Sequence, residues 1–223
     1  MCGRAVRSTS MAEVARHFGA INRTSLGPSY NVAPSTDVAL VRVAEVGGDR
    51  ELVSARWGLV PSWVKPGEQK LPTFSNARAE TVAEKPSFRR AFARRRCLVP
   101  FDGFYEWQTL GPKDKRPAYF SLRSGAPMAM AALWEHNAAL ELDSVAVVTT
   151  TANGVVTPVH DRMPVILESE EEQRAWLDSS LELPAVELLL RPCRDEALQR
   201  VPVSKRVNSV AYNEPDCIAP LPV

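Results

Sequence analysis

Apolar residues in this chain gather in short runs divided by glycine and proline, and only a few stretches repeat them at helical spacing. Short runs rich in β-branched and aromatic residues are typical of strands. The pattern therefore predicts strands at residues 38–43, 51–57, 97–99, 104–108, 118–122, 128–134, 144–150 and 164–167.

Two helices are marked by capping boxes, in which a serine before the helix pairs with a glutamate three residues later. Ser10 with Glu13 predicts a helix that ends at Gly19, and Ser169 with Glu172 predicts another. Two further helices are expected at residues 87–95 and 184–191. The helices do not alternate regularly with the strands, which disfavours a parallel doubly wound sheet.

The pattern predicts one α+β domain over residues 1–223, with a mostly antiparallel, barrel-like sheet and flanking helices. Hydrophobic residues make up 45% of the chain and charged residues 24%, which is typical of a soluble globular protein. No apolar run approaches the roughly 20 residues that a membrane span needs. The formal net charge is only +1, so a nucleic-acid site would have to come from clustered arginines.

One such cluster is the polar face of the helix expected at residues 87–95, which carries Arg89, Arg90, Arg94 and Arg95. Faces of this kind are usually solvated surface, and a nucleic-acid site is the alternative interpretation.

The four cysteines are far apart in the sequence and form no Cys-x-x-Cys pair. Their spacing argues against a zinc site and against a secreted disulfide framework. We therefore expect no metal, no organic cofactor and a reducing, cytoplasmic location.

Cys2 becomes the first residue of the chain if Met1 is removed. It then carries an α-amine, with a reference pKa of about 7.7–8.0, beside a thiol with a reference pKa of about 8.5. Such a pair condenses with an aldehyde, first as a Schiff base and then as a thiazolidine ring. By itself the position of Cys2 is explained more simply by the start of translation, so the rest of the chain has to decide.

Polar residues in four segments stand where packing alone would not put them. Asn76 has an amide that could orient a nucleophile, and Arg78 could hold a phosphate. The alternative is an ordinary turn in which Thr81 and Glu84 form another capping box.

Glu106 lies between two aromatic residues, where a desolvated carboxyl would have a raised pKa suited to acid–base work. In a strand it could equally face water. His160 stands in a loop between prolines and could transfer protons near neutral pH, or simply bond to the backbone. Trp57, Pro61 and Trp63 could form an apolar platform for a base, or belong to the core.

Eight short motifs occur in order along nearly the whole chain. They are Met-Cys-Gly-Arg at 1–4, Asn-Val-Ala-Pro at 31–34, Trp-Gly-Leu-Val-Pro-Ser-Trp at 57–63, Asn-Ala-Arg-Ala-Glu-Thr at 76–81, Arg-Cys-Leu-Val-Pro at 96–100, Asp-Gly-Phe-Tyr-Glu-Trp at 102–107, His-Asp-Arg-Met-Pro at 160–164 and Pro-Val-Ser at 202–204. Together they resemble the SOS-response-associated peptidase family, whose members shield abasic sites in single-stranded DNA. One departure is Val64, where some relatives carry a large aromatic residue.

The resemblance implies roles for four residues. Cys2 resembles the nucleophile that becomes covalently joined to the abasic sugar, as a crosslink that can also reverse. Asn76 resembles the residue that positions it, and Glu106 with His160 resembles the acid–base pair.

The resemblance also implies a surface for single-stranded DNA and single-strand/double-strand junctions. The expected DNA contacts are Arg4, Arg78, Arg162, Trp57, Pro61, Trp63 and Pro34. We expect a monomer, and in a bacterium a cytoplasmic protein that joins the nucleoid when it is on DNA. Two alternatives remain, namely a cysteine-type peptidase acting on itself or others, and a non-covalent reader of modified or damaged DNA.

Overall fold

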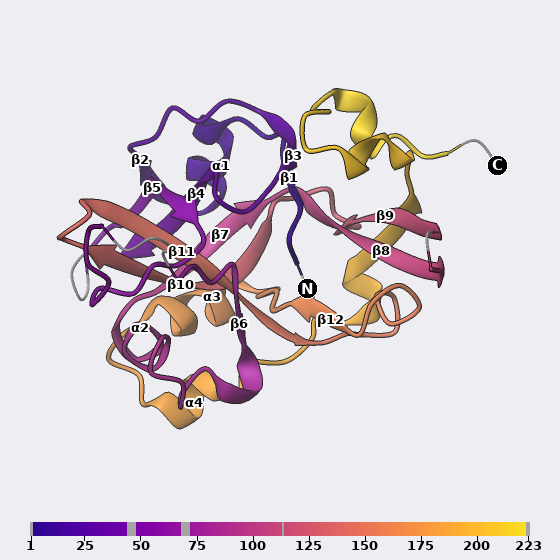
Figure 1. Cartoon of the computed structure of the whole chain (residues 1–223). Coiled ribbons are helices and arrows are strands. Elements are labelled where there is room, and N and C mark those ends of the chain that lie inside the picture. The colour runs from indigo at the N-terminus through magenta and orange to yellow at the C-terminus, as the bar shows by residue number, and fades with distance from the viewer. Residues whose placement is uncertain (1, 44–47, 68–71, 113, 222–223) are drawn as a thin grey trace.

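The strands of this protein form two sheets, which Figure 1 shows. The structure is a computed structural model and describes residues 2–43, 48–67, 72–112 and 114–221. The five-stranded sheet has the order β13 (Leu198–Pro202), β9 (Asp114–Leu122), β8 (Gly103–Gly111), β1 (Ala5–Arg7) and β3 (Ser29–Val32). The larger sheet has the order β12 (Arg162–Pro164), β11 (Leu142–Thr151), β10 (Met128–Asn137), β7 (Arg96–Phe101), β4 (Asp37–Val43), β5 (Arg50–Trp57) and β2 (Ala20–Asn22), with β6 (Asn76–Arg78) beside β11.

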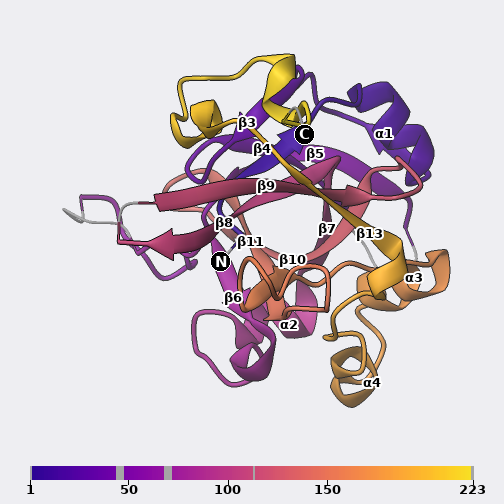
Figure 2. The same cartoon turned by 90° about the vertical axis from the view of Figure 1, so that its right-hand side faces the viewer.

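The larger sheet closes on itself, because β11 pairs with β10 along one edge and with β5 along the other. The strands β11, β10, β7, β4 and β5 therefore form a closed ring, and the predicted barrel-like α+β fold is confirmed. Neighbours within the ring are antiparallel except at the β11–β5 junction. Figure 2 shows β9 and β13 crossing in front of this ring.

Alternate residues of the barrel strands face two different cores, as the two-residue period of a strand requires. The inner core includes Cys2 and Trp57, together with residues of the five-stranded sheet such as Phe104. The outer core lies between the barrel and the helices, where Phe92 and Trp176 have ring centroids 6.0 Å apart. Among the described residues, no helix is both long and apolar enough to span a bilayer.

The expected helices are present, although shorter at their ends. They are α1 (Met11–His17), α2 (Arg89–Arg94), α3 (Glu170–Leu177) and α4 (Leu183–Glu187), with 3₁₀ turns η1 (Ala79–Thr81), η2 (Asp195–Ala197), η3 (Lys205–Asn208) and η4 (Pro215–Ile218). Both predicted capping boxes form, at Ser10 and at Ser169. The capping box expected at Thr81 is wrong, because Thr81 lies in η1 and its hydroxyl is buried without a hydrogen-bond partner among the described residues.

Every predicted strand is present except at residues 165–167. This segment leaves the β12 ladder after Pro164, although the N–H groups of Val165 and Leu167 still donate to neighbouring strands at 2.9 Å. Five short strands were not predicted, namely β1, β2, β3, β6 and β13. They are three to five residues long, too short for an apolar alternation to stand out.

Candidate functional site

Cys2 lies shortly before β1, which stands between β8 and β3 in the five-stranded sheet. The N–H of Tyr105 on β8 donates to the carbonyl of Arg4 at 2.9 Å, which fixes how the two strands are aligned. The antiparallel register continues from this pair toward the start of the chain. In this register Cys2 lies one residue from the position that faces Glu106 on β8.

The Cys2 side chain is fully buried and packs in the inner core. Burial raises the pKa of the Cys2 thiol, and the neighbouring Glu106 raises it further, while the N–H of Arg4 offsets only part of this effect. Burial therefore disfavours the thiolate of Cys2 in this structure of the chain. A buried neutral thiol is a weak nucleophile, so reaction at Cys2 requires a group that accepts its proton.

Glu106 can serve as that group. It is 4% exposed, so the alternative of a water-facing strand glutamate is wrong. Burial raises the pKa of Glu106, and the charge of His160 opposes part of the shift. A carboxyl whose pKa is displaced toward neutrality can both accept and return a proton near physiological pH.

His160 reaches this region from the loop between β11 and β12. Its Nδ1 accepts a hydrogen bond from the backbone N–H of Arg162 at 2.9 Å, which leaves Nε2 to carry the proton of the neutral ring. A carboxylate oxygen of Asp161 lies 2.9 Å from the same Nδ1 and would accept a hydrogen bond from the Nδ1–H of a charged ring. The loop therefore has a partner for either protonation state of His160.

Gln108 ties the His160 loop to the strand of Glu106, a role that the sequence did not indicate. Its side-chain amide donates to the carbonyl of Pro158 at 3.0 Å. Since Gln108 is two residues from Glu106, both side chains leave the same face of β8. A lone glutamine near a strand end gives no signal that separates it from other surface polar residues.

Asn76 is the first residue of β6, which runs parallel to β11. In this pairing Asn76 is opposite Val147. Val147 packs in the same inner core as Cys2. The side-chain oxygen of Asn76 is buried and has no hydrogen-bond partner among the described residues. Leaving a buried acceptor unpaired costs about 1–3 kcal/mol, which is expected where a ligand supplies the missing donor.

Arg162 is held by Glu80, which lies in η1, the turn that follows β6. Both guanidinium nitrogens Nη1 and Nη2 donate to the Glu80 carboxylate, the second at 2.9 Å, and Nη2 also donates to the carbonyl of Thr149 at 2.6 Å. The pair lowers the pKa of Glu80. Arg162 thus joins the strand of Asn76 to the loop of His160, and a phosphate would have to displace Glu80 to take up the contact that the sequence predicts.

Replacing Glu80 with alanine is expected to lower the free energy of unfolding by about 1–3 kcal/mol, because the largely buried Arg162 guanidinium loses its carboxylate partner. Urea denaturation measures the effect. The exposed Glu84 in the same segment provides the control, since Glu84→Ala should change stability by no more than about 0.5 kcal/mol. Equal stability of the two variants would show that the Glu80–Arg162 pair is not a structural clamp.

The other two expected phosphate contacts differ in environment. Arg4 is half-buried, and its guanidinium donates to the side chain of Asn31 and to the carbonyl of Val207, each at 2.7 Å. Arg78 is exposed on β6 and forms no ion pair with any described residue. Arg78 is therefore the freer of the two to contact a ligand.

The aromatic segment is divided between core and surface. Trp57 is fully buried, and Pro61 is buried as well, so neither side chain is displayed at the surface, and their contact with DNA stays a prediction. Trp63 is 60% exposed and is free to stack on a ligand. Val64 is buried, so it offers no surface wedge, whereas Pro34 is half-buried at the surface.

Asp102 and Gly103 belong to the same motif as Glu106, but the fold accounts for them. The Asp102 carboxylate accepts hydrogen bonds from the backbone and hydroxyl groups of Ser8 and Thr9. A Cβ at Gly103 would collide with the carbonyl oxygen of Phe120. Asp102 thus ties the end of β1 to the start of β8, and Gly103 lets β8 and β9 approach closely.

Comparison with known proteins agrees with this fold. A family model described as SOS response associated peptidase (SRAP) matches residues 1–210. The abasic site processing protein YoqW of Bacillus subtilis is 37% identical over 98% of this chain and 99% of its own length. The abasic site processing protein HMCES of Gallus gallus is 33% identical over 99% of this chain and 78% of its own length.

Solved structures show the same architecture. A protein from Bacteroides thetaiotaomicron superposes with a TM-score of 0.88 at 25% identity, covering 99% of this chain and 100% of that one. A phage-related protein from Bordetella bronchiseptica has a TM-score of 0.74 at 29% identity, covering 92% and 95% of the two chains. With the family model spanning nearly its whole length, the chain belongs to the SOS response associated peptidase (SRAP) family.

Proposed function

We propose that this protein traps abasic sites in single-stranded DNA by a covalent bond to Cys2, after Met1 has been removed. The observation that carries the proposal is the convergence of Cys2, Glu106 and His160 from three separate elements. Glu106 interacts electrostatically with both of the others. The names of the curated relatives support DNA with abasic sites as the partner.

The proposed reaction balances with the loss of one water. The α-amine of Cys2 adds to the C1′ aldehyde of the opened sugar, and the carbinolamine loses water to give an imine. The thiol then adds across the C=N bond, so that sulfur bonds to carbon and nitrogen gains the proton. The resulting thiazolidine has no imine left, which protects the strand from β-elimination, and the reverse steps release the protein.

The site residues take complementary parts in these steps. His160 exchanges a proton with the ring oxygen as the sugar opens. Glu106 accepts a proton from the amine or thiol and returns it when water leaves. Asn76 receives a hydrogen bond at its buried oxygen and so positions the reacting groups.

The burial of Cys2 argues against a peptidase that acts on other proteins. Such an enzyme attacks with an ionised thiol, which burial disfavours at Cys2, whereas the proposed reaction with DNA begins at the α-amine. A non-covalent reader would leave the convergence of Cys2, Glu106 and His160 without a role.

The test is a denaturing gel after incubation with single-stranded DNA that contains one abasic site. The wild-type protein should give a heat-stable shifted band, and Cys2→Ala should give none. Cys193→Ala is the matched control, because Cys193 is also a buried cysteine of the inner core. A wild-type protein that binds this DNA but gives no shifted band would favour the reader and refute the proposal.

A further inference from the structure

The exposed face of α2 is strongly basic. Arg89, Arg90 and Arg94 are exposed, whereas Ala91 and Phe92 between them are buried in the outer core. We call Arg89, Arg90 and Arg94 the α2 basic face. None of the three forms an ion pair within the part of the chain that the structure describes, so their charges are available to a partner.

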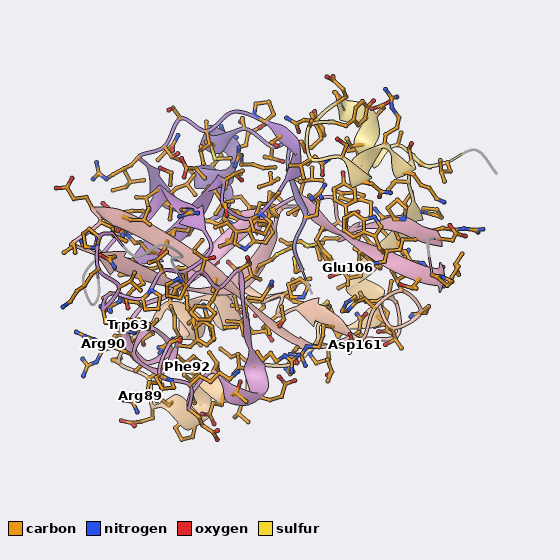
Figure 3. All side chains as sticks on the ribbon, in the orientation of Figure 1. Trp63, Arg89, Arg90, Phe92, Glu106 and Asp161 are labelled. Carbon is orange, nitrogen blue, oxygen red and sulfur yellow. The ribbon has the colours of Figure 1, made fainter. Side chains whose placement is uncertain are left out.

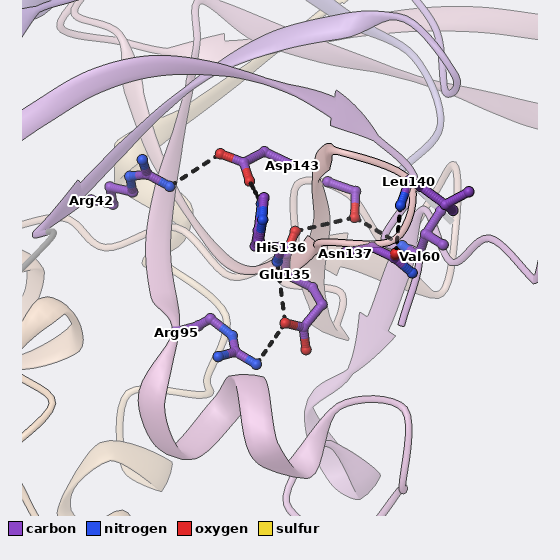
Figure 4. Close-up of polar contacts among 9 residues, drawn as sticks. Arg42, Val60, Arg95, Glu135, His136, Asn137, Leu140 and Asp143 are labelled. Carbon is purple, nitrogen blue, oxygen red and sulfur yellow. Dashed lines mark hydrogen bonds and ion pairs between the residues drawn. The ribbon is translucent and has the colours of Figure 1, made fainter. Parts of the chain in front are cut away.

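The two arginines that follow α2 in the sequence do not belong to this face. Arg95 forms an ion pair of 2.6 Å with the buried Glu135, as Figure 4 shows. Arg96 is buried, and its guanidinium donates to backbone carbonyls, including that of Trp176 at 2.6 Å. The fold thus uses Arg95 and Arg96 internally and leaves the α2 basic face exposed.

Trp63 lies on the same side of the molecule as the α2 basic face, as Figure 3 shows for Arg89 and Arg90. Phe74 connects the two segments, because it pairs with Leu59 near the start of the Trp63 loop and its ring lies 5.3 Å from that of Phe88. Phe88 is the residue directly before α2.

The Trp63 loop is also fixed to the barrel. The side chain of Asn137 donates to the carbonyls of Pro61 at 2.9 Å and of Val64 at 3.0 Å. The N–H of Val60 donates to the hydroxyl of Ser144 at 2.9 Å, drawn in Figure 4. An exposed indole on an anchored loop loses little freedom when a flat group stacks on it.

The strand β6 joins this surface to the candidate site. Asn76, the first residue of β6, follows Phe74 by only two residues, and Arg78 is exposed at its other end. In Figure 3 Trp63, Arg89 and Arg90 lie to one side, while Glu106 and Asp161 lie to the other. Exposed cations therefore occur both on β6 and beyond it.

We propose that the α2 basic face extends the DNA contact expected at Trp63 and binds the single strand of DNA that continues past the abasic site. The proposal rests on the proposed function and adds a second contact region to it. Guanidinium groups match phosphate oxygens, and an exposed indole stacks on any base without selecting its identity. The combination fits a flexible, anionic, base-bearing strand.

The test measures equilibrium binding of DNA that carries a non-reactive tetrahydrofuran abasic analogue, as a function of salt. Two oligonucleotides are used, of about 16 and about 4 nucleotides, which span the range of single-strand site sizes. The variant is Arg89→Gln/Arg90→Gln/Arg94→Gln. The matched control is Arg16→Gln/Arg123→Gln/Arg200→Gln, whose arginines lie on other elements.

The α2 variant should bind the long oligonucleotide about 10- to 100-fold more weakly at 0.1 M salt, and its slope of log K against log salt should be smaller by about 2. Binding of the short oligonucleotide, and the control variant, should match the wild type. An unchanged slope on the long oligonucleotide, or equal losses on both lengths, would overturn the proposal. So would a loss confined to substrates whose flank is double-stranded.

Failure of the proposed function would look different. In that case the wild-type protein would form no heat-stable adduct with reactive abasic DNA of either length, whatever the salt dependence of the α2 variant.

Discussion

Replacing Cys2 with serine is expected to abolish the heat-stable adduct with abasic DNA and to leave only a reducible one. Cys2→Ser keeps the α-amine, which still forms the imine, but its hydroxyl closes a ring far less readily than a thiol. The imine hydrolyses on heating, so a band should survive the denaturing gel only after borohydride reduction. The wild-type band should need no reduction.

The paired controls separate the two nucleophiles of Cys2. Acetylation of the mature α-amine should remove both kinds of band, because no imine can form. If Cys2→Ser gave a heat-stable band without borohydride, the thiol would be dispensable and ring closure would be wrong. If acetylated protein gave the wild-type band, the amine would have no part in the bond.

Replacing Glu106 with glutamine is expected to slow adduct formation by about 10²–10⁴-fold, the usual contribution of a positioned acid–base group. The same change should alter the pH profile. In the wild type the rate should fall on acidification as the carboxylate gains a proton and stops accepting one. Because burial raises the pKa of Glu106, this fall should lie above the ordinary glutamate value of about 4.3.

Single-turnover rates measured across pH test this prediction. The Glu106→Gln profile should lack this acid limb, since an amide does not titrate. It should keep only the fall at higher pH, where the α-amine of Cys2, with a reference pKa of about 7.7–8.0, gains a proton. Glu135→Gln serves as the control, because Glu135 is also a buried glutamate but pairs with Arg95 outside the site. An acid limb that persists unchanged in Glu106→Gln would assign the titrating proton acceptor to another group.

The sequence predicts those parts of the fold whose signal is local. The capping boxes at Ser10 and Ser169 form as expected, because a serine and a glutamate three residues apart suffice to cap a helix. The strand β6 gives no such signal, because its three residues are a strand only by pairing with β11, which is distant in the sequence. Its tertiary setting, not its composition, makes it a strand.

The site shows the same division between local and distant information. The motifs single out Cys2, Glu106 and His160, but the sequence leaves open whether Glu106 faces water, which the pairing of β1 with β8 decides. Burial likewise separates Trp57 from Trp63, although the two stand in one motif. Such facts depend on packing between distant segments.

Mass spectrometry of the crosslinked N-terminal peptide tests the central claim most directly. After nuclease and protease digestion, the peptide should begin at Cys2 without Met1 and carry the sugar residue with the loss of one water. Its thiol should resist alkylation, and borohydride should not change its mass. A peptide that retains Met1, or whose Cys2 thiol is still alkylated by iodoacetamide in the adduct, would contradict the account.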